Sequence, residues 1–155
     1  MSMFANIDAA ASGMTAERLR MDVISNNIAN ANTTRTQQGG PYRRRYVVFQ
    51  PRESKEQTFA SALAERVGRQ VKNNSMHGGE GVRATAIETD DSPGPLVYDP
   101  GHPDANDQGY VERPNVNIVT EMVDMITASR AYQANTAAIA AAKSMAQQAL
   151  NIGRS

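Results

Sequence analysis

The sequence predicts an α+β fold, in which long N- and C-terminal helices pair as a coiled-coil-like bundle around a small β-rich middle domain. Two observations carry this prediction. Apolar residues recur at steps of three and four near both ends of the chain, which is the spacing of one helix face. All 7 Pro, and all of the 11 Gly except Gly13 and Gly153, lie between residues 35 and 114. We therefore expect a helix with its exit in residues 1–34, a β-rich domain in residues 35–114 and a second helix in residues 115–155.

The N-terminal helix is expected over residues 2–30. Gly13 interrupts it as a weakness of about 1 kcal/mol relative to Ala. Asparagines crowd the end of the helix, where their side chains compete with the backbone for hydrogen bonds. Two interpretations stay open: the asparagines end the helix, or they form buried polar contacts between packed helices. The periodic positions of this helix are Phe4, Ile7, Ala11, Met14, Arg18, Met21, Ile24 and Ile28.

The middle of the chain is punctuated by turn residues and short β-type runs. A turn at residues 39–41 precedes a strand expected over residues 42–50, which are rich in Tyr and Val. Alternation predicts a second strand at residues 82–89, and the prolines that follow leave room for short strands only at residues 96–98 and 110–112. Apolar residues at every fourth position also predict an amphipathic helix over residues 57–72, followed by a Gly- and Asn-rich loop up to residue 81.

The C-terminal helix is the longest predicted element. Residues 115–150 contain no Gly or Pro and are rich in Ala, Met and Gln, which are favourable helix formers. Pro114 cannot continue a helix backward, Asn117 is a favoured N-cap, and Glu121 places negative charge near the positive helix end. At 1.5 Å per residue the helix is about 50 Å long. A stripe of heptad spacing is expected to face a partner at Ile118, Met122, Met125, Ser129, Tyr132, Thr136, Ile139, Lys143, Ala146 and Leu150.

The two helices cannot bury their apolar surface on each other alone. Burying a large apolar side chain gains about 1.5–3 kcal/mol, whereas ordering each backbone residue costs about 1–2 kcal/mol. Pairing covers one stripe on each helix, and the faces left over are poor in charge and rich in Ala, Met and Ile. We therefore expect the helices to complete their burial against other subunits.

Composition and motifs favour no catalytic or ligand-binding function. The net charge is +0 and the pI is about 6.7, and alternating strand geometry sends Arg43, Arg44 and Arg45 to both faces, so a solvated or interface strand is favoured over a nucleic-acid surface. The chain has no Cys and only 2 His. No catalytic motif is visible, and Glu121 with Asp124 is read as the first turn of a helix, not an acid/base pair. No enzyme activity, cofactor or small-molecule substrate is expected.

One acidic loop invites comparison with a calcium site. Starting the calcium-loop pattern at Asp104 places Asn106, Gln108 and Gly109 in register, but its last position falls on Asn115 where a Glu is required. A Pro/Gly/Asp turn is the favoured interpretation of residues 99–109, with an ion site as the alternative. The chain also lacks a basic region followed by an apolar core, so no cleavable secretory signal is expected.

Three stretches of the chain carry a family resemblance. SGMTAERLRMDVISNNIANANTT and PNVNIVTEMVDMITASRAYQANTAAI resemble the paired terminal motifs of bacterial flagellar axial proteins, the rod, hook and hook-associated subunits. LVYDPGHPDAN, with the following GYV and PNVN, is similar to the proximal-rod branch of that family. Residues 53–79 depart from the pattern as an insertion, for which surface decoration or contact with a surrounding ring are both open interpretations.

The resemblance implies a structural subunit of the proximal rod of the flagellar basal body, exported by the flagellar type III system and polymerised through its terminal helices to transmit torque for motility. Expected partners are further copies, other rod subunits, an adaptor at the rod base or membrane ring, and the export gate in transit, with no nucleic acid. Another rod or hook subunit, or a cytoplasmic coiled-coil adaptor of the export apparatus, is the alternative. Phe4 and Ile7 are candidates for export recognition. Subunit contacts are expected at Met14, Met21, Ile24, Asn27, Ile28, Asn30, Met122, Met125, Ile126, Tyr132, Asn135, Ile139 and Leu150.

Overall fold

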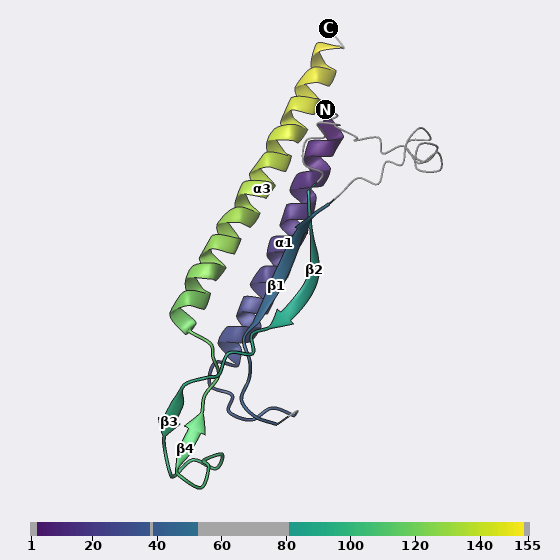
Figure 1. Cartoon of the computed structure of the whole chain (residues 1–155). Coiled ribbons are helices and arrows are strands. Elements are labelled where there is room, and N and C mark those ends of the chain that lie inside the picture. Colours follow the sequence, from purple (N-terminus) through teal and green to yellow (C-terminus); the bar gives the residue numbers. More distant parts are fainter. Residues whose placement is uncertain (1–2, 38, 53–80, 154–155) are drawn as a thin grey trace, which may run out of the picture.

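Two long helices and two antiparallel β-hairpins make up the part of the chain that the structure describes, so the predicted α+β class is confirmed. This structure is a computed structural model, and it describes residues 3–37, 39–52 and 81–153. The helix and most of the loop predicted for residues 57–81 lie outside the described residues. The helices are α1 (Met3–Ala29) and α3 (Ile118–Ile152), and the strands are β1 (Arg45–Pro51), β2 (Val82–Thr89), β3 (Leu96–Tyr98) and β4 (Tyr110–Glu112) (Figure 1).

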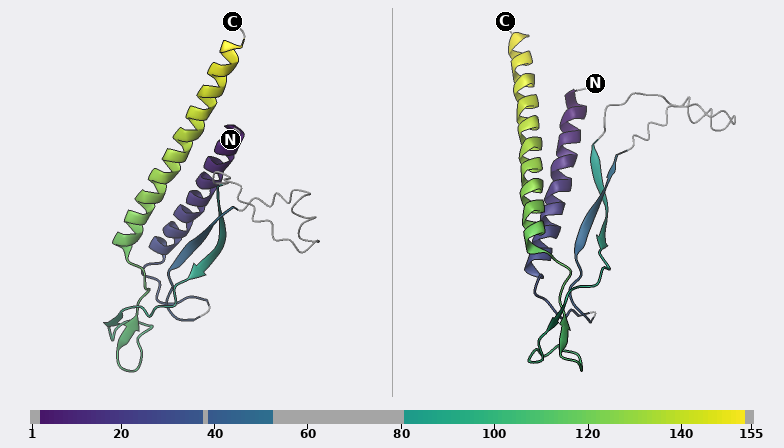
Figure 2. Two further views of the ribbon diagram at one scale, coloured as in Figure 1. Left: turned by 45° about the horizontal axis from the view of Figure 1, so that its top comes forward. Right: turned by 60° about the vertical axis from the view of Figure 1, so that its left-hand side comes forward.

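The helix α1 lies between α3 and the β1–β2 hairpin (Figures 1 and 2). The helices run antiparallel, because Asn27 near the end of α1 bonds Glu121 in the first turn of α3, while Gly13 lies against Asn135 further along. The core is thin and built from small or branched residues: Ala16, Val23, Ile24, Ala31, Val111, Ala128 and Ala142. No described helix is long and apolar enough to span a membrane.

The stripe of α3 that packs on α1 is only partly the one that the heptad spacing predicts. Met125, Tyr132 and Ile139 are half-buried as expected, but Met122 and Leu150 are largely exposed. The buried positions of α3 are instead Glu121, Ala128 and Ala142. Alanine lets two helix backbones approach closely, and Glu121 is held by hydrogen bonds, so these residues set the rotation of α3.

Gly13 has a packing role that the propensity argument missed. A Cβ atom built on Gly13 would lie 2.7 Å from the amide nitrogen of Asn135, closer than ordinary contact. The missing side chain therefore makes room for the Asn135 carboxamide in the contact between α1 and α3. Gly13 is unfavourable within a helix, but here its missing side chain lets α1 and α3 pack closely.

The strand predictions are correct except for β1, which spans Arg45–Pro51 and not residues 42–50. Strand β2 and the short strands β3 and β4 match the predicted ranges, and β1 pairs with β2 with a bulge between Val48 and Phe49. β1 begins at Arg45 and not at Tyr42. The backbone N–H of Tyr42 donates to Thr33, and that of Arg44 donates to the side chain of Asn115, so neither is available to the strand ladder.

Replacing Gly94 with alanine is expected to lower the free energy of unfolding by about 1–3 kcal/mol. A Cβ atom at this position would overlap the carbonyl oxygen of Arg113, next to the β3–β4 hairpin. Gly101→Ala is the matched control, because the nearest heavy atom to its Cβ would be 3.7 Å away. Urea denaturation of both variants tests this, and equal effects of the two substitutions would contradict it.

Candidate assembly interface and the polar network that positions it

Asn27 is the centre of a buried polar network that joins α1, β1 and α3. Its side chain is 0 % exposed. Its amide nitrogen donates to the Arg45 carbonyl at 2.8 Å and to Glu121 Oε2 at 2.9 Å. Its oxygen accepts from the Tyr42 hydroxyl and from the Arg45 backbone N–H, both at 3.0 Å. All four hydrogen-bonding positions of the carboxamide are thus filled, and Asn27 pairs with Arg45 much as a neighbouring strand would.

Glu121 is the buried charge of this network, with only 1 % of the residue exposed. Its Oε1 accepts from Arg44 Nε at 2.7 Å, while its Oε2 accepts from Asn27. Arg44 also approaches Asp124 at 3.5 Å, and Arg20 of α1 approaches the other oxygen of Asp124 at the same distance. A buried carboxylate is tolerated only when it is paired and hydrogen-bonded, so these contacts fix how the three elements meet.

Asn115 holds the same segment from the opposite side. Its side-chain oxygen accepts from the Arg44 backbone N–H at 2.7 Å, and its amide donates to the carbonyls of Asp90 and Ser92. The hydroxyl and backbone N–H of Ser92 both donate to the Asp90 carboxylate, which lowers the pKa of Asp90 below its ordinary value. Asn27, near the end of α1, and Asn115, just before α3, therefore hold the start of β1 from two sides.

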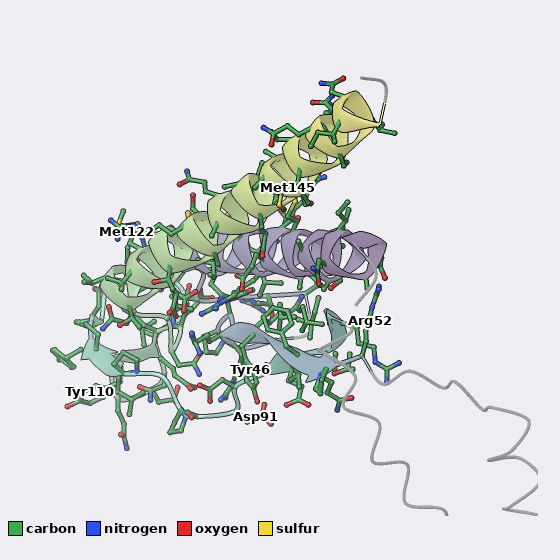
Figure 3. The ribbon with its side chains drawn as sticks, turned by 90° about the horizontal axis from the view of Figure 1, so that it is seen from above. Tyr46, Arg52, Asp91, Tyr110, Met122 and Met145 are labelled. Carbon is green, nitrogen blue, oxygen red and sulfur yellow. The ribbon has the colours of Figure 1, made fainter. Side chains whose placement is uncertain are left out.

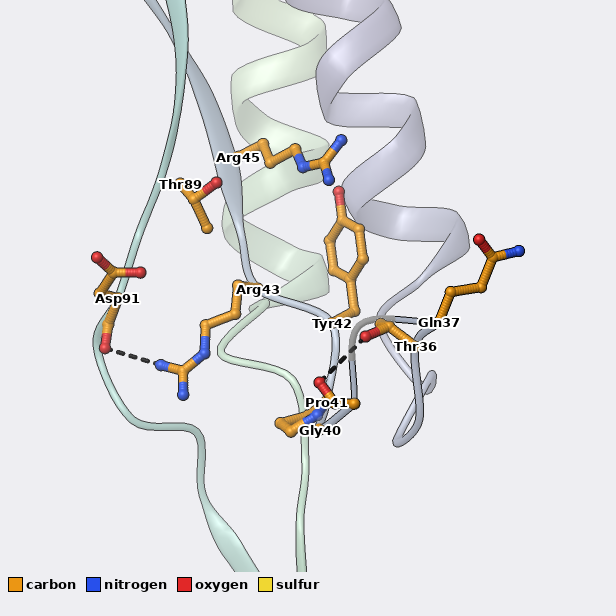
Figure 4. Close-up of a pocket in the computed structure, with 10 residues that line it drawn as sticks. Thr36, Gln37, Gly40, Pro41, Tyr42, Arg43, Arg45, Thr89 and Asp91 are labelled. Carbon is orange, nitrogen blue, oxygen red and sulfur yellow. Dashed lines mark hydrogen bonds between the residues drawn. The ribbon is translucent and has the colours of Figure 1, made fainter.

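Tyr42 closes the network towards solvent. Burial raises the pKa of the Tyr42 phenol, the Arg45 guanidinium opposes the shift, and Glu121 adds to it. The phenol therefore stays protonated at neutral pH and can donate to Asn27. The Arg45 guanidinium lies over the Tyr42 ring, 5.9 Å from its centre (Figure 4).

Removing the Tyr42 hydroxyl with Tyr42→Phe is expected to cost about 1 kcal/mol of folding free energy, because Asn27 loses one buried hydrogen bond. Tyr46→Phe is the control. The hydroxyl of Tyr46 donates to Glu88 at an exposed site, so its loss is expected to cost less than about 0.5 kcal/mol. Thermal and urea unfolding would measure both values. A larger loss for the Tyr46 variant would contradict the role given to Tyr42.

A groove of about 690 Å³ lies beside this network and holds two of the three consecutive arginines (Figure 4). Both are engaged within the chain. Arg43 donates to the carbonyls of Asp91 and Ser92 and lies 3.7 Å from Glu112, while Arg45 stacks on Tyr42. Their contacts fit a structural role better than nucleic-acid binding. Among the described residues, no group of three or more His, Asp or Glu side chains could hold a metal ion.

An exposed apolar face on the first turns of α3 is the strongest candidate for a contact with another molecule. Val119, Met122, Val123 and Ile126 lie at steps of three and four, and each is between 55 and 71 % exposed. Figure 3 shows Met122 on the side of α3 away from α1. The opposite side of the same turns is covered by α1 and by the polar network. This face, called the proximal patch below, is too apolar for an ordinary solvated helix.

The structure divides the predicted contact residues into three groups. Ile24 and Asn27 are buried within the chain, and Met122, Ile126 and Leu150 are exposed. The half-buried residues are Met14, Met21, Ile28, Asn30, Met125, Tyr132, Asn135 and Ile139. Ile7 is also half-buried, and the Phe4 side chain lies outside what the structure describes.

Sequence reasoning missed the roles of Glu121 and Arg44. Glu121 was expected as a first-turn charge and Arg44 as part of a solvated or interface strand, but the two form a charged hydrogen bond where α1, β1 and α3 meet. For Asn27, the second interpretation of the asparagine run is correct, since its amide makes buried contacts between packed elements. Asn26 and Asn30 instead donate to carbonyls one turn earlier in the chain.

Comparison with known proteins places the chain among flagellar proteins. The family model described as "Flagella basal body rod protein" matches residues 7–37, and that described as "Flagellar basal body rod FlgEFG protein C-terminal" matches residues 107–152. The flagellar basal-body rod protein FlgC of Borreliella burgdorferi is 49% identical, over 98% of this chain and 98% of its own. The FlgC proteins of Bacillus subtilis and Escherichia coli are 44% and 35% identical, each over 99% of this chain and 100% of their own.

Proposed function

The chain belongs to the FlgC family of flagellar basal-body rod proteins, and from this premise we propose that its helix pair packs against the helices of neighbouring rod subunits. It is a structural subunit of the rod and not an enzyme. The single observation that carries the proposal is the proximal patch, Val119, Met122, Val123 and Ile126, which no described part of the chain covers. Neighbouring helices that are poor in charge would bury it.

The contacts within one chain separate the residues that pack inside it from those that can contact neighbouring subunits. Asn27 and Ile24 are committed to packing inside the chain, so their role in assembly is to hold α1 and α3 in one arrangement. Met122, Ile126 and Leu150 are free to contact neighbours directly. The half-buried Tyr132 and Asn135 lie at the margin of the helix pair, where a neighbour could reach them. Alanine at either position would then weaken rod assembly more than it weakens the isolated chain.

The wider role follows from the same proposal. Partners would be other copies, other rod subunits, and an adaptor at the rod base or membrane ring. The flagellar type III export gate would carry the chain across the membrane without a cleaved signal, with Phe4 and Ile7 as recognition residues. The three-part division at residues 34 and 114 would assign assembly to the helices and outer contacts to the β-rich middle, including the insertion at residues 53–79. The assembled helices would transmit torque along the rod.

Cell fractionation tests the proposal against its main rival. A rod subunit is expected to co-purify with isolated basal bodies, whereas a cytoplasmic coiled-coil adaptor of the export apparatus would remain in the cytosol. A strain lacking an early rod component is the control, because a rod subunit should then be lost from the basal-body fraction. Recovery only in the cytosol of the motile strain would overturn the proposal.

A further inference from the structure

We propose that the distal end of the C-terminal helix of one rod subunit docks head to tail on the proximal patch of the next subunit. This inference rests on the proposed function and identifies which surfaces meet. The proximal patch is the apolar face at the start of α3, and the surface it would receive is the free end of another C-terminal helix. The chain carries both halves of this contact on α3 itself.

The first half of the contact is a face that the chain cannot cover by itself. Glu121 and Ala128 point towards α1 and are 1 % and 0 % exposed. On the other side of these turns, Met122 and Ile126 are each 55 % exposed. The buried network fixes this rotation, so α3 cannot turn to hide the patch. An outside partner has to supply the cover.

The second half is the end of α3 that extends past α1. Asn27 meets Glu121, and Gly13 meets Asn135, so a step of 14 residues along one helix matches a step of 14 along the other. Continuing this register brings Met3, where α1 begins, level with Met145. The rest of α3, up to residue 152, therefore projects beyond α1, as Figures 1 and 2 show.

Large apolar side chains are exposed at and beyond the level where α1 begins, among the polar residues Gln147, Gln148 and Asn151. Leu150 is 70 % exposed and Met145 is 58 % exposed. Between this end and the proximal patch, the exposed residues of α3 are mostly small or polar, such as Gln133, Ala137 and Ala141. The exposed large apolar side chains of α3 therefore form two separate groups at opposite ends of one helix.

The direction in which the subunits point along the rod determines how these two groups can meet. In a rod whose subunits all point the same way, a neighbour shifted along the axis brings the end of its α3 beside the start of the next α3, so the two exposed apolar groups can meet. About 26 residues separate the centres of the two groups, so the shift between the subunits would be about 40 Å. Such a contact between unlike surfaces leaves a free surface at each end and can continue along the axis. It also brings the negative end of one helix dipole towards the positive end of the next.

The chemistry of the partner follows from the family comparison. The matched C-terminal family model is named for the rod proteins FlgEFG, so the C-terminal element is common to several rod proteins. The occupant would therefore be the last turns of such a C-terminal helix, with apolar side chains and few charges, supplied by the axial neighbour. A start-to-start pairing of two proximal patches would instead give a closed pair.

Site-specific photo-crosslinking in assembled rods tests the inference. A photoreactive phenylalanine replaces Ile126 in one strain and Leu150 in another; both sites are exposed, so the fold of the chain is unaffected. Basal bodies are isolated, and mass spectrometry maps the linked peptides. Position 126 is expected to link to the last turns of a rod subunit's C-terminal helix, and position 150 to the first turns of such a helix. Gln133, two turns beyond Ile126 on the same side, is the control, and it is expected to give no link to a distal helix end.

The outcomes separate this inference from the proposed function. If the chain is present in basal bodies but position 126 links to the start of another C-terminal helix, to a non-rod protein or to nothing, the head-to-tail contact is wrong and the rod function stands. If the chain is absent from basal bodies, both fail. Links from position 126 to a distal end, together with links from position 150 to a helix start, support the proposal.

Discussion

Replacing Asn27 with alanine is expected to lower the free energy of unfolding by about 3–5 kcal/mol, because it breaks a buried charged network from within. The substitution removes all four hydrogen bonds of the carboxamide. It leaves the backbone of Arg45 without its pairing and leaves one oxygen of the buried Glu121 carboxylate unpartnered. A buried acceptor without a donor bears its full desolvation cost. Urea denaturation followed by circular dichroism measures the change.

The neighbouring Asn26 provides the matched control. Its side chain is exposed, and its amide donates only to the carbonyl of Asp22, one turn earlier in α1. Asn26→Ala is therefore expected to change stability by no more than about 0.5 kcal/mol. Similar losses from the two substitutions would show that the asparagine run acts through the helix end alone, and the network argument would be wrong.

Asn27→Asp separates shape from hydrogen bonding. Aspartate fits the same space, but at neutral pH it has no N–H to donate and places a second negative charge beside Glu121. We expect it to destabilise the chain at least as much as alanine does. Wild-type stability of the aspartate variant would mean that packing, and not the donor pair, is what Asn27 contributes.

Local signals explain why most of the secondary structure could be predicted. The Asn117 side chain caps α3 by accepting from the N–H groups of Val119 and Thr120, as expected of a residue at that position. The alternation of side-chain types predicted β2, and the prolines predicted that β3 and β4 are short. Each of these signals depends on a few adjacent residues, which is information that a sequence carries directly.

The rotation of α3 could not be predicted in the same way. The heptad stripe scored Met122 as a contact for α1, because methionine is apolar and glutamate is not. The hydrogen bond between Asn27 and Glu121 joins residues 94 positions apart, and it turns the acidic side of the first turn inward. Polar contacts between residues so far apart in the chain leave no periodic pattern in the sequence. The signal that could have found them is the combination of Asn, Arg and Glu at the junctions of helices and strand.

The rotation of α3 explains why large apolar side chains are exposed on its outer side. In an isolated chain, turning Glu121 inward and Met122 outward sacrifices hydrophobic burial, which a monomeric protein has no reason to do. In a subunit of a larger assembly the same choice is consistent, because the polar network fixes the monomer and leaves the apolar side chains for neighbours. The inner side of the helix pair thus stabilises the chain, and its outer side is available to neighbouring subunits.

Deleting residues 146–155 is expected to abolish motility and rod assembly while leaving expression intact. The deleted residues of α3 lie beyond the start of α1, and Leu150 is 70 % exposed, so little contact within the chain is lost. The free energy of unfolding of the isolated chain is expected to change by no more than about 0.5 kcal/mol. Swimming assays, basal-body isolation and urea denaturation measure the three effects.

A shorter deletion provides the control for this prediction. Removing only residues 153–155 keeps all of α3, which ends at Ile152, and should preserve motility. Normal swimming by the longer deletion strain would count heavily against an assembly role for the helix end. Loss of stability in the longer deletion would also contradict the argument, since it would mean that the chain itself uses those turns. An inactive but fully stable chain is the combination that an assembly contact predicts.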